Sequence, residues 1–321
     1  MDGRASHVPV LADEVARVLV PEGPGQDEQV LVDATVGAGG HAERLLEASG
    51  SGSRLLGIDR DESALDIARR RLDRFGDRVR LVQGNFDELE GIVGGVDWGP
   101  VGGILYDFGV SSMHLDSPGR GFSYREEAPL DMRMDRIQEF TAADIVNTYP
   151  HPDLARIIRT YGEERWASRI ATFIVEARRR RPLSTTLELV EIIRDAVPSA
   201  ARRGGPHPAR RTFQALRIEV NGELDAISSS LPQAVATLRD GGRLVAISYH
   251  SLEDRIVKRF MVDESRGEVP RLRVITRRPV QPEPEEIAAN PRAKAAKLRA
   301  AERWGLHPSG GFSPRPGGSA A

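Results

Sequence analysis

The feature that most constrains this chain is a glycine turn within VDATVGAGGH, residues 32–41. A short apolar run ending in Asp33 precedes the turn and is typical of a buried parallel strand. Gly37, Gly39 and Gly40 follow, and the sequence after them has helical character. Glycines at a strand-to-helix turn let the backbone adopt positive φ and let a ligand approach the main chain closely. The glycine turn therefore predicts a ligand crevice at the carboxyl end of a parallel strand.

Three later strand ends place acidic or aromatic residues at the same edge of the predicted sheet. Asp59 lies in GIDR, Phe86 follows the alternating run VRLVQ, and Asp107 lies in YDFGVSS. An acid one strand after the glycines is placed to accept from ribose hydroxyls. This combination resembles an S-adenosylmethionine-dependent methyltransferase. A nicotinamide site needs only the glycines and one acid, and Gly37-x-Gly39-x-x-Ala42 also fits its fingerprint.

Composition limits the class of protein. The 321 residues suffice for one large domain or two modest ones, and a hydrophobic fraction of 40% supports a substantial core. The absence of cysteine excludes disulfides and thiolate metal sites and fits a reducing cytosol. No signal pattern begins the sequence, and no apolar run approaches the ~20 residues that cross a bilayer. We expect a cytoplasmic protein with no membrane contact and no bound metal.

The net charge of −2 hides an asymmetry along the chain. Residues 1–150 carry a net charge of −12, whereas residues 151–213 carry +6 and residues 266–303 carry +5. The basic residues are nearly all arginine, which fits either a compositional bias of the genome or the binding of phosphates. A basic region beside an acidic ligand-binding half predicts a polyanionic partner.

Strands and helices alternate before and after a helical stretch, which predicts a parallel sheet with an insertion. The PEPEE segment before the last strand is expected to prevent regular structure, and Ser184 is a candidate helix N-cap. The predicted strands are 29–35, 54–59, 79–85, 102–107, 241–250, and a closing pair at 272–280 and 296–304. The predicted helices are 7–19, 41–49, 63–75, 141–149, 152–162, 163–180, 184–197, 211–227 and 251–261.

These patterns predict an α/β protein with a Rossmann-like class I S-adenosylmethionine-dependent methyltransferase fold and an inserted all-helical domain. Residues 1–114 and 214–304 would form the methyltransferase domain, and residues 115–213 the helical insertion. The Gly-, Pro- and Ser-rich residues 305–321 are expected to be a disordered tail.

Sequence blocks spread over nearly the whole chain carry a more specific resemblance. They are HVPVLADEV, VGAGGH, GIDRD, YDFGVSS, RGFSYREEAPLDMRMD, YGEERWASRIA, HPARRTFQALRIEVNGEL and SYHSLEDRIVKRFM. In this order they resemble the bacterial ribosomal small-subunit RNA methyltransferase H family, once called MraW. The resemblance implies transfer of a methyl group from S-adenosyl-L-methionine to the exocyclic N4 of a decoding-centre cytidine. The implied partner is 16S rRNA in the small ribosomal subunit. The sequence does not decide whether the protein forms a homo-oligomer.

The resemblance also implies individual site residues. The implied cofactor-binding residues are Gly39, Gly40, His41, Asp59, Phe86, Asp107 and His114. The chain departs from the family pattern at His114, where Gln is usual, and at Phe108, where Leu is usual. Purely structural roles compete with these readings: helix capping for His41 and core packing for Phe86.

The acceptor amine sets the catalytic requirement. The lone pair of a cytosine N4 is delocalised into the ring, so the amine needs hydrogen-bond acceptors and in-line positioning. Asp107, or a backbone carbonyl near it, is the candidate acceptor. His250 is the second candidate catalytic residue, placed to contact the base or its phosphate, although a structural histidine fits equally well. A buried cytidine would also have to be flipped into the site.

Two other functions fit parts of the sequence. A nicotinamide-dependent oxidoreductase rests on the glycine spacing alone, and a non-catalytic RNA-binding or assembly factor would retain the fold without the chemistry. The arginine run at 178–181 is either a solvated helix end or a contact for RNA phosphates.

Overall fold

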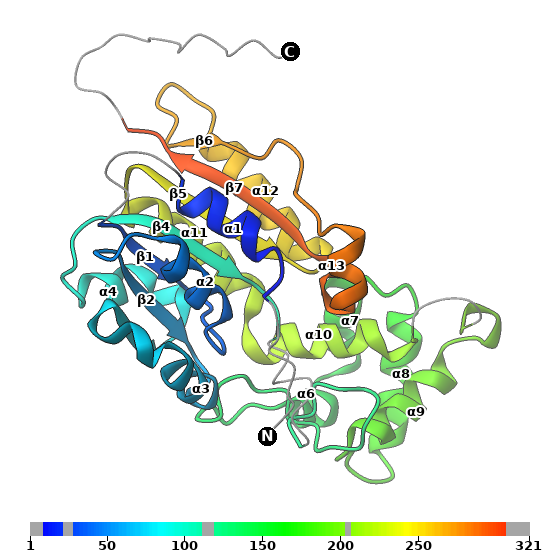
Figure 1. The fold of residues 1–321 in the computed structure, drawn as a ribbon. Coiled ribbons are helices and arrows are strands. Elements are labelled where there is room, and N and C mark those ends of the chain that lie inside the picture. The colour runs from blue at the N-terminus through cyan, green and yellow to red at the C-terminus, as the bar shows by residue number, and fades with distance from the viewer. Residues whose placement is uncertain (1–8, 22–27, 111–118, 203–206, 306–321) are drawn as a thin grey trace.

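A central sheet organises the structure, a computed structural model that describes residues 9–21, 28–110, 119–202 and 207–305. Within these residues the sheet has seven strands in the order β3-β2-β1-β4-β5-β7-β6 (Figure 1). The strands are β1 (Val30–Asp33), β2 (Arg54–Asp59), β3 (Val79–Gln83), β4 (Val101–Asp107), β5 (Leu238–Ser248), β6 (Leu272–Val274) and β7 (Lys297–Arg303).

The first five strands pair in parallel, and β7 lies antiparallel between β5 and β6. Strand β1 is bonded to β2 on one side and to β4 on the other, so the strand order reverses there. A crevice outside the carboxyl ends of the strands at such a reversal is where open α/β sheets bind ligands. The observed sheet confirms the predicted Rossmann-like α/β class and the closing strand pair, which the structure shows to be antiparallel.

Helices cover both faces of the sheet, which explains the apolar strands. In β1, Leu31 and Val32 are both buried but belong to different cores, because successive side chains point to opposite faces. One face is covered by α1 (Ala12–Leu19), α2 (Gly40–Ala48) and α3 (Glu62–Leu72). The other is covered by α4 (Leu89–Gly94), α11 (Glu223–Thr237) and α12 (Ser251–Glu264). Among the described residues, no helix is long and apolar enough to span a membrane.

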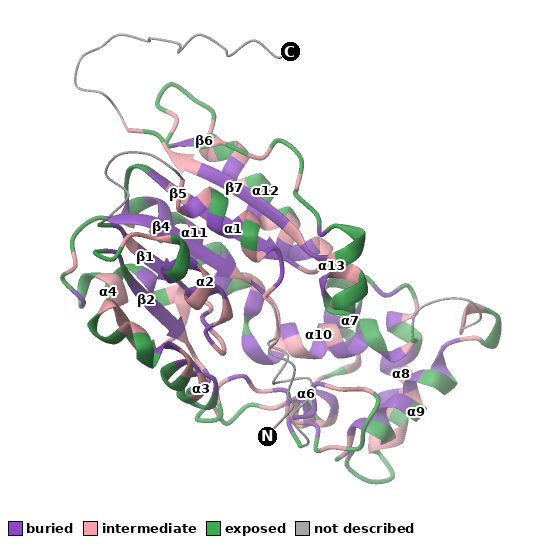
Figure 2. Cartoon of the chain, in the orientation of Figure 1, coloured by how far each residue is buried: buried purple, intermediate pink, exposed green. Residues whose placement is uncertain are grey.

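The helices that follow β4 bury a core of their own, away from the sheet (Figures 1 and 2). This core contains side chains from Phe122 to Val220 and none from a strand of the sheet. Its helices are α6 (Ala142–Thr148), α7 (His151–Thr160), α8 (Ala167–Arg178), α9 (Thr186–Ala196) and α10 (Ala209–Asn221). The helical character predicted for the insertion is confirmed for its described residues, while the domain limits at 115 and 213 stay a prediction.

Two predicted elements were wrong in their extent. The helix expected at 211–227 is divided into α10 and α11 at Gly222, whose φ of 60° places it in the left-handed region. The PEPEE segment was expected to be irregular, yet Pro284 begins α13 (Pro284–Ala289). Proline is tolerated at the first position of a helix, because the amide hydrogen it lacks would have had no partner there.

The N-cap of α9 is Thr185, and not Ser184 as predicted. The Thr185 hydroxyl accepts from the Glu188 amide, and the Glu188 carboxylate accepts from the Thr185 amide, which forms a capping box. Ser184 donates to the same carboxylate through its amide at 2.9 Å and through its hydroxyl at 3.3 Å, but its hydroxyl accepts no amide of the helix. The two residues are chemically alike, so the sequence alone did not distinguish them.

Thr185→Ala should lower the free energy of unfolding by about 1 kcal/mol, because it removes the capping hydroxyl. Ser184→Ala is the matched control and should cost less, since the capping box remains. Chemical denaturation of both variants measures the difference, and equal losses would show that the Thr185 cap is not the stabilising contact.

Candidate active site

The glycine turn has the backbone conformation that its sequence predicts. Gly37 and Gly39 have φ values of 51° and 81°, and Gly39 is the N-cap of α2. A Cβ atom on Gly39 would lie 3.3 Å from the side chain of Leu72 and 3.4 Å from Ala68 in α3. The turn is therefore packed closely against α3, which fixes where the N-terminus of α2 opens.

Asp59 connects the end of β2 to the glycine turn. One carboxylate oxygen accepts from the Gly37 amide at 2.9 Å, and the other accepts from the Asp61 amide at 2.9 Å. The structure thus brings together two segments that the sequence placed at one edge of the sheet. Each oxygen of a carboxylate has two lone pairs, so these bonds leave acceptor capacity on Asp59 for a ligand.

Asp107 ends β4 and is contacted from three directions. Its Oδ1 accepts from the Tyr249 hydroxyl at 2.8 Å, and its Oδ2 lies 3.4 Å from Nε2 of His41. Its amide donates to the Thr35 hydroxyl at 2.6 Å. The predicted site residues Asp107 and His41 are therefore neighbours, and we define these four residues as the Asp107 cluster.

The sequence interpretation missed Tyr249 and Thr35 as members of the Asp107 cluster. Tyr249 directly follows β5, and β5 pairs in parallel with β4. Thr35 directly follows Ala34, whose amide is bonded to Leu105 in β4. The signal that could have found both is their position just beyond strand ends that flank β4 in the sheet.

His41 is a buried neighbour of the Asp107 carboxylate and does not cap the helix. Burial lowers the pKa of His41, but the carboxylate of Asp107 and then that of Asp33 outweigh it and raise the pKa above its ordinary value. The contact with Asp107 is an ion pair whose geometry falls outside that of a hydrogen bond. The capping role considered from the sequence belongs to Gly39 instead.

Asp33 adds a buried acid at the end of β1. Its Oδ1 accepts from the Thr35 amide at 3.2 Å, while its buried Oδ2 has no hydrogen-bond partner. Burial is the main reason that its pKa is raised to about 7, and the carboxylates of Asp107 and Asp59 act in the same direction. His41 and the Thr35 bond oppose this shift. The crevice therefore has three carboxylates, which suits a ligand with positive charge.

Phe86 lies in the short helix η2 (Phe86–Glu88) directly after β3. Its ring centroid is 5.7 Å from that of Tyr106 and 5.9 Å from that of Phe108. It also faces the Arg60 guanidinium at 5.8 Å. Phe86 is only partly buried, so it packs on the core without being enclosed by it.

A pocket of 340 Å³ opens beside the ends of β2 and β3. It lies between the sheet edge and the loop that follows residue 134, which brings the helical part of the chain close to Asn85. The lining residues are Arg60, Gln83, Gly84, Asn85, Asp135, Ile137, Gln138, Val220 and Asn221. The ends of β2 and β3 thus border an open space large enough for a heterocyclic group.

His250 is the N-cap of α12, and its side chain contacts Glu253. Its Nδ1 accepts from the Glu253 amide at 3.4 Å, and its Nε2 lies 3.1 Å from Oε1 of Glu253. No contact between the His250 side chain and Asp107 occurs among the described residues, so a catalytic role for His250 stays a prediction. His114, the other predicted histidine, lies outside the described residues.

His250 belongs to a buried network of charges beneath Tyr249. Ligand atoms of Glu223, His250 and Glu253 lie within 4.8 Å of one another. Arg217, however, binds Glu223 through two bonds of 2.8 Å. Burial raises the pKa of Glu253, but His250 and then Arg217 outweigh it and lower the pKa below its ordinary value. The group is therefore held together by the Arg217–Glu223 ion pair and by the contacts between His250 and Glu253.

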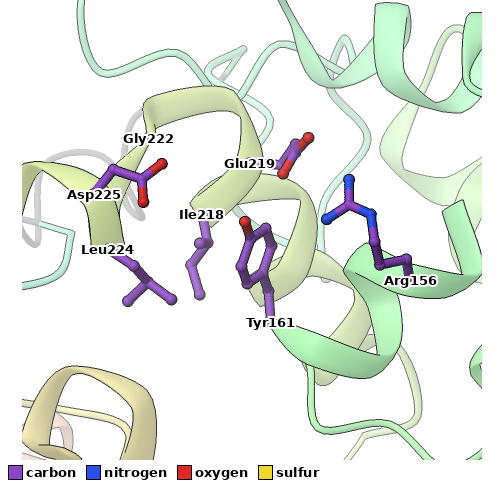
Figure 3. Close-up of a pocket in the computed structure, with 7 residues that line it drawn as sticks. All are labelled: Arg156, Tyr161, Ile218, Glu219, Gly222, Leu224 and Asp225. Atoms are coloured by element: carbon purple, nitrogen blue, oxygen red, sulfur yellow. The ribbon is translucent and has the colours of Figure 1, made fainter. Parts of the chain in front are cut away.

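A second pocket, of 230 Å³, lies at the junction of α10 and α11 (Figure 3). Figure 3 shows Arg156 on α7 pointing toward Glu219 on α10, with the ring of Tyr161 beside Ile218. The other lining residues are Ile218, Gly222, Leu224 and Asp225. None of the predicted site residues lines this pocket, so the chemistry is assigned to the crevice at the strand ends.

The strand order, the glycine turn and the acids at the ends of β2 and β4 define an S-adenosylmethionine-dependent methyltransferase. The profile of the MraW methylase family matches residues 4–304. The chain belongs to the MraW methylase family.

Relatives that are about half identical in sequence agree with this assignment. The ribosomal RNA small subunit methyltransferase H of Acidothermus cellulolyticus is 49% identical over 309 residues, covering 92% of this chain and 93% of that protein. The protein of the same name from Thermobifida fusca is 50% identical, covering 93% of each. A crystal structure of a putative rRNA-methylase from Clostridium thermocellum covers 91% of this chain and 94% of its own, with a TM-score of 0.43 at 12% identity.

Because the pKa of Asp33 is raised in the folded protein, ionisation of Asp33 should lower the free energy of unfolding as the pH rises. The folded pKa of about 7 exceeds the ordinary value of 3.8, so the folded state binds this proton more tightly than the unfolded state between these values. Stability from protonated Asp33 is therefore present below pH 3.8 and lost as pH rises through about 7.

Asp33→Asn cannot ionise. Its free energy of unfolding relative to the wild type should increase by about 1–3 kcal/mol from acidic to mildly alkaline pH. Urea denaturation of both proteins across that range measures this difference. A difference independent of pH would contradict the assigned pKa.

Proposed function

We propose that this protein transfers the methyl group of S-adenosyl-L-methionine to the exocyclic N4 of a decoding-centre cytidine in 16S rRNA. The observation that carries the proposal is the Asp107 carboxylate, a partly exposed acceptor at the end of β4, contacted by both His41 and Tyr249. The substrate is supported by the resemblance of the sequence blocks and by relatives named ribosomal RNA small subunit methyltransferase H. The proposed setting is the small ribosomal subunit in the cytoplasm.

The residues of the crevice fit the methyl donor. The amides of Gly40 and His41 at the N-terminus of α2 suit its carboxylate, because unpaired amides there attract anions. Gly39 stays a proposed cofactor contact, and its own amide donates to the Val36 carbonyl at 2.8 Å. Asp59 has acceptor capacity for the ribose hydroxyls, and Asp107 carries the negative charge that favours a sulfonium. When bound, the sulfonium supplies an electrophilic methyl group.

The adenine end fits the edge formed by β2 and β3. Phe86 offers a partly exposed ring for stacking, and the adjoining pocket lined by Arg60 and Asn85 has a volume of 340 Å³. His114 stays a proposed cofactor contact, since it lies outside the described residues.

Asp107 has the properties that the acceptor amine requires. Its two oxygens keep lone pairs beyond those used by Tyr249 and His41, so it can accept from the N–H groups of the amine. Nε2 of His41 lies 3.4 Å from Oδ2 and restrains that side of the carboxylate. His250 already caps α12 through Glu253, and its contact with the target base or phosphate stays a prediction.

The helical insertion is the proposed RNA-contacting surface because residues 151–213 carry a net charge of +6. Arg165, just before α8, and Arg169 on α8 are both exposed. They lie over the rings of Trp166 at 5.1 Å and Phe173 at 5.4 Å. Such pairs of an arginine and an aromatic ring suit phosphates and unstacked bases.

Only part of the arginine run at 178–181 is available for RNA. Arg178 donates to the Val146 carbonyl at 2.8 Å, and Arg181 pairs with Glu188. Arg179 and Arg180 are exposed, and neither forms an ion pair within the described part of the chain. Substitution of these two residues therefore tests whether the basic surface binds RNA.

The decisive test of the function uses Asp107→Ala. Loss of the acceptor should slow single-turnover transfer from labelled S-adenosylmethionine to small subunits by about 100-fold or more. Mass mapping of the labelled 16S rRNA identifies the modified atom in the wild-type reaction. A near-normal rate would remove Asp107 from the chemistry, and label on any atom other than a cytidine N4 would refute the proposed function.

The double variant Arg179→Ser, Arg180→Ser should weaken binding to small subunits and reduce the salt slope of log K by about 1 for each lost phosphate contact. The matched control is Arg69→Ser, Arg74→Ser, which removes two exposed arginines from the acidic half. Binding to small subunits, measured at several salt concentrations, gives the salt slope of each double variant for comparison. An unchanged slope for the first variant would mean that the run is a solvated helix end.

A further inference from the structure

We propose that Tyr249 is a positioning residue of the methyl-transfer site, whose phenol holds the Asp107 carboxylate in the orientation that accepts the target amine. The inference rests on the proposed function, because it concerns how Asp107 meets that amine. Tyr249 donates to Oδ1 of Asp107 at 2.8 Å, across 142 residues of sequence. This bond connects the end of β5 to the end of β4 at the mouth of the crevice.

The ring of Tyr249 lies against the chain that follows Asp107. A Cβ atom on Gly109 would be 3.4 Å from Cδ2 of Tyr249, and Gly109 has a φ of 100°. The amide of Phe108 donates to the Ile247 carbonyl at 3.0 Å, so bonding between the two chain segments continues beyond the end of β4. The glycine at 109 therefore leaves room for the tyrosine ring at this closest approach.

The backbone of Tyr249 is itself fixed by a buried acid. Its amide donates to Oε2 of Glu253 at 2.8 Å, and Glu253 is fully buried. His250 accepts from the Glu253 amide, and the Glu253 carboxylate in turn accepts from the His250 amide at 3.2 Å. This capping box lies within the segment SYHSLEDR. It fixes the backbone of Tyr249 in the position from which its side chain contacts Asp107.

The phenol is kept in the donating form. Burial first, and then the negative charge of Asp107, raise the pKa of Tyr249 well above its ordinary value. Tyr249 therefore donates at neutral pH. With Tyr249 on Oδ1 and His41 near Oδ2, each oxygen of Asp107 has one donor neighbour, and rotation of the carboxylate would lose both contacts.

Tyr249→Phe removes one hydroxyl and keeps the ring. The Asp107 carboxylate would then be restrained only by His41, and the amine would meet an acceptor of variable orientation. We expect the single-turnover rate at saturating S-adenosylmethionine to fall by roughly 10- to 100-fold, because positioning acts in the transition state. The dissociation constants for S-adenosylmethionine and for small subunits should change by about 2-fold or less.

Tyr149→Phe is the matched control. The Tyr149 hydroxyl donates to Oε1 of Glu219 at 2.8 Å, which is the same chemical pair in the helical part of the chain. Both variants should lose a similar, small amount of thermal stability. Only Tyr249→Phe should lose transfer rate, and a purely structural role of Tyr249 does not predict that separation.

A crystal structure of Tyr249→Phe gives a readout that is independent of activity. The inference predicts that the Asp107 side chain changes its χ2 angle or becomes disordered while the backbone of β4 and β5 is unchanged. An Asp107 carboxylate in its wild-type position, together with a wild-type rate, would overturn the inference. A loss of cofactor affinity equal to the loss of rate would also overturn it and make Tyr249 a ground-state ligand residue.

Failure of the inference and failure of the proposed function are separated by the wild-type reaction run in parallel. If wild-type protein labels a cytidine N4 and Tyr249→Phe does so at the same rate, only the positioning role is lost. If wild-type protein labels another atom, the proposed function fails whatever Tyr249 does.

Discussion

The site depends on one carboxylate, that of Asp107, contacted by Tyr249 at one oxygen and by His41 near the other. These contacts join the end of β4 to the end of β5 and to the first turn of α2, which are separated by long stretches of sequence. The parallel sheet brings them together because all its strand ends meet at one edge. The glycine turn completes the arrangement, since its amide at Gly37 is bonded to Asp59 on the next strand.

The crevice is acidic, and this has an energetic consequence. Asp33, Asp59 and Asp107 lie at neighbouring strand ends. Burial first, and then the carboxylates of Asp107 and Asp59, raise the pKa of Asp33 to about 7. His41 offsets part of this repulsion, because its own pKa is raised by the acids around it. A bound cation would offset more of it, so the repulsion favours a positively charged ligand such as a sulfonium.

Much of the fold could be predicted from the sequence, because its strong signals are local. Apolar runs ending in Asp33, Asp59 and Asp107 marked three strands, and all three acids lie at strand ends as expected. The secondary-structure prediction was wrong where the local sequence fits more than one structure. Pro284 begins a helix, and Gly222 divides one helix into two. Tyr249 was missed because its partner is 142 residues away, a relation that only the strand order reveals.

The central claim is that the crevice holds S-adenosylmethionine with its reactive end beside Asp107. A crystal structure with S-adenosylhomocysteine tests it most directly. The account predicts the ribose hydroxyls within hydrogen-bond distance of Asp59, the carboxylate at the amides of Gly40 and His41, and the sulfur facing Asp107. A ligand whose sulfur points away from Asp107, or whose ribose makes no contact with Asp59, would contradict it.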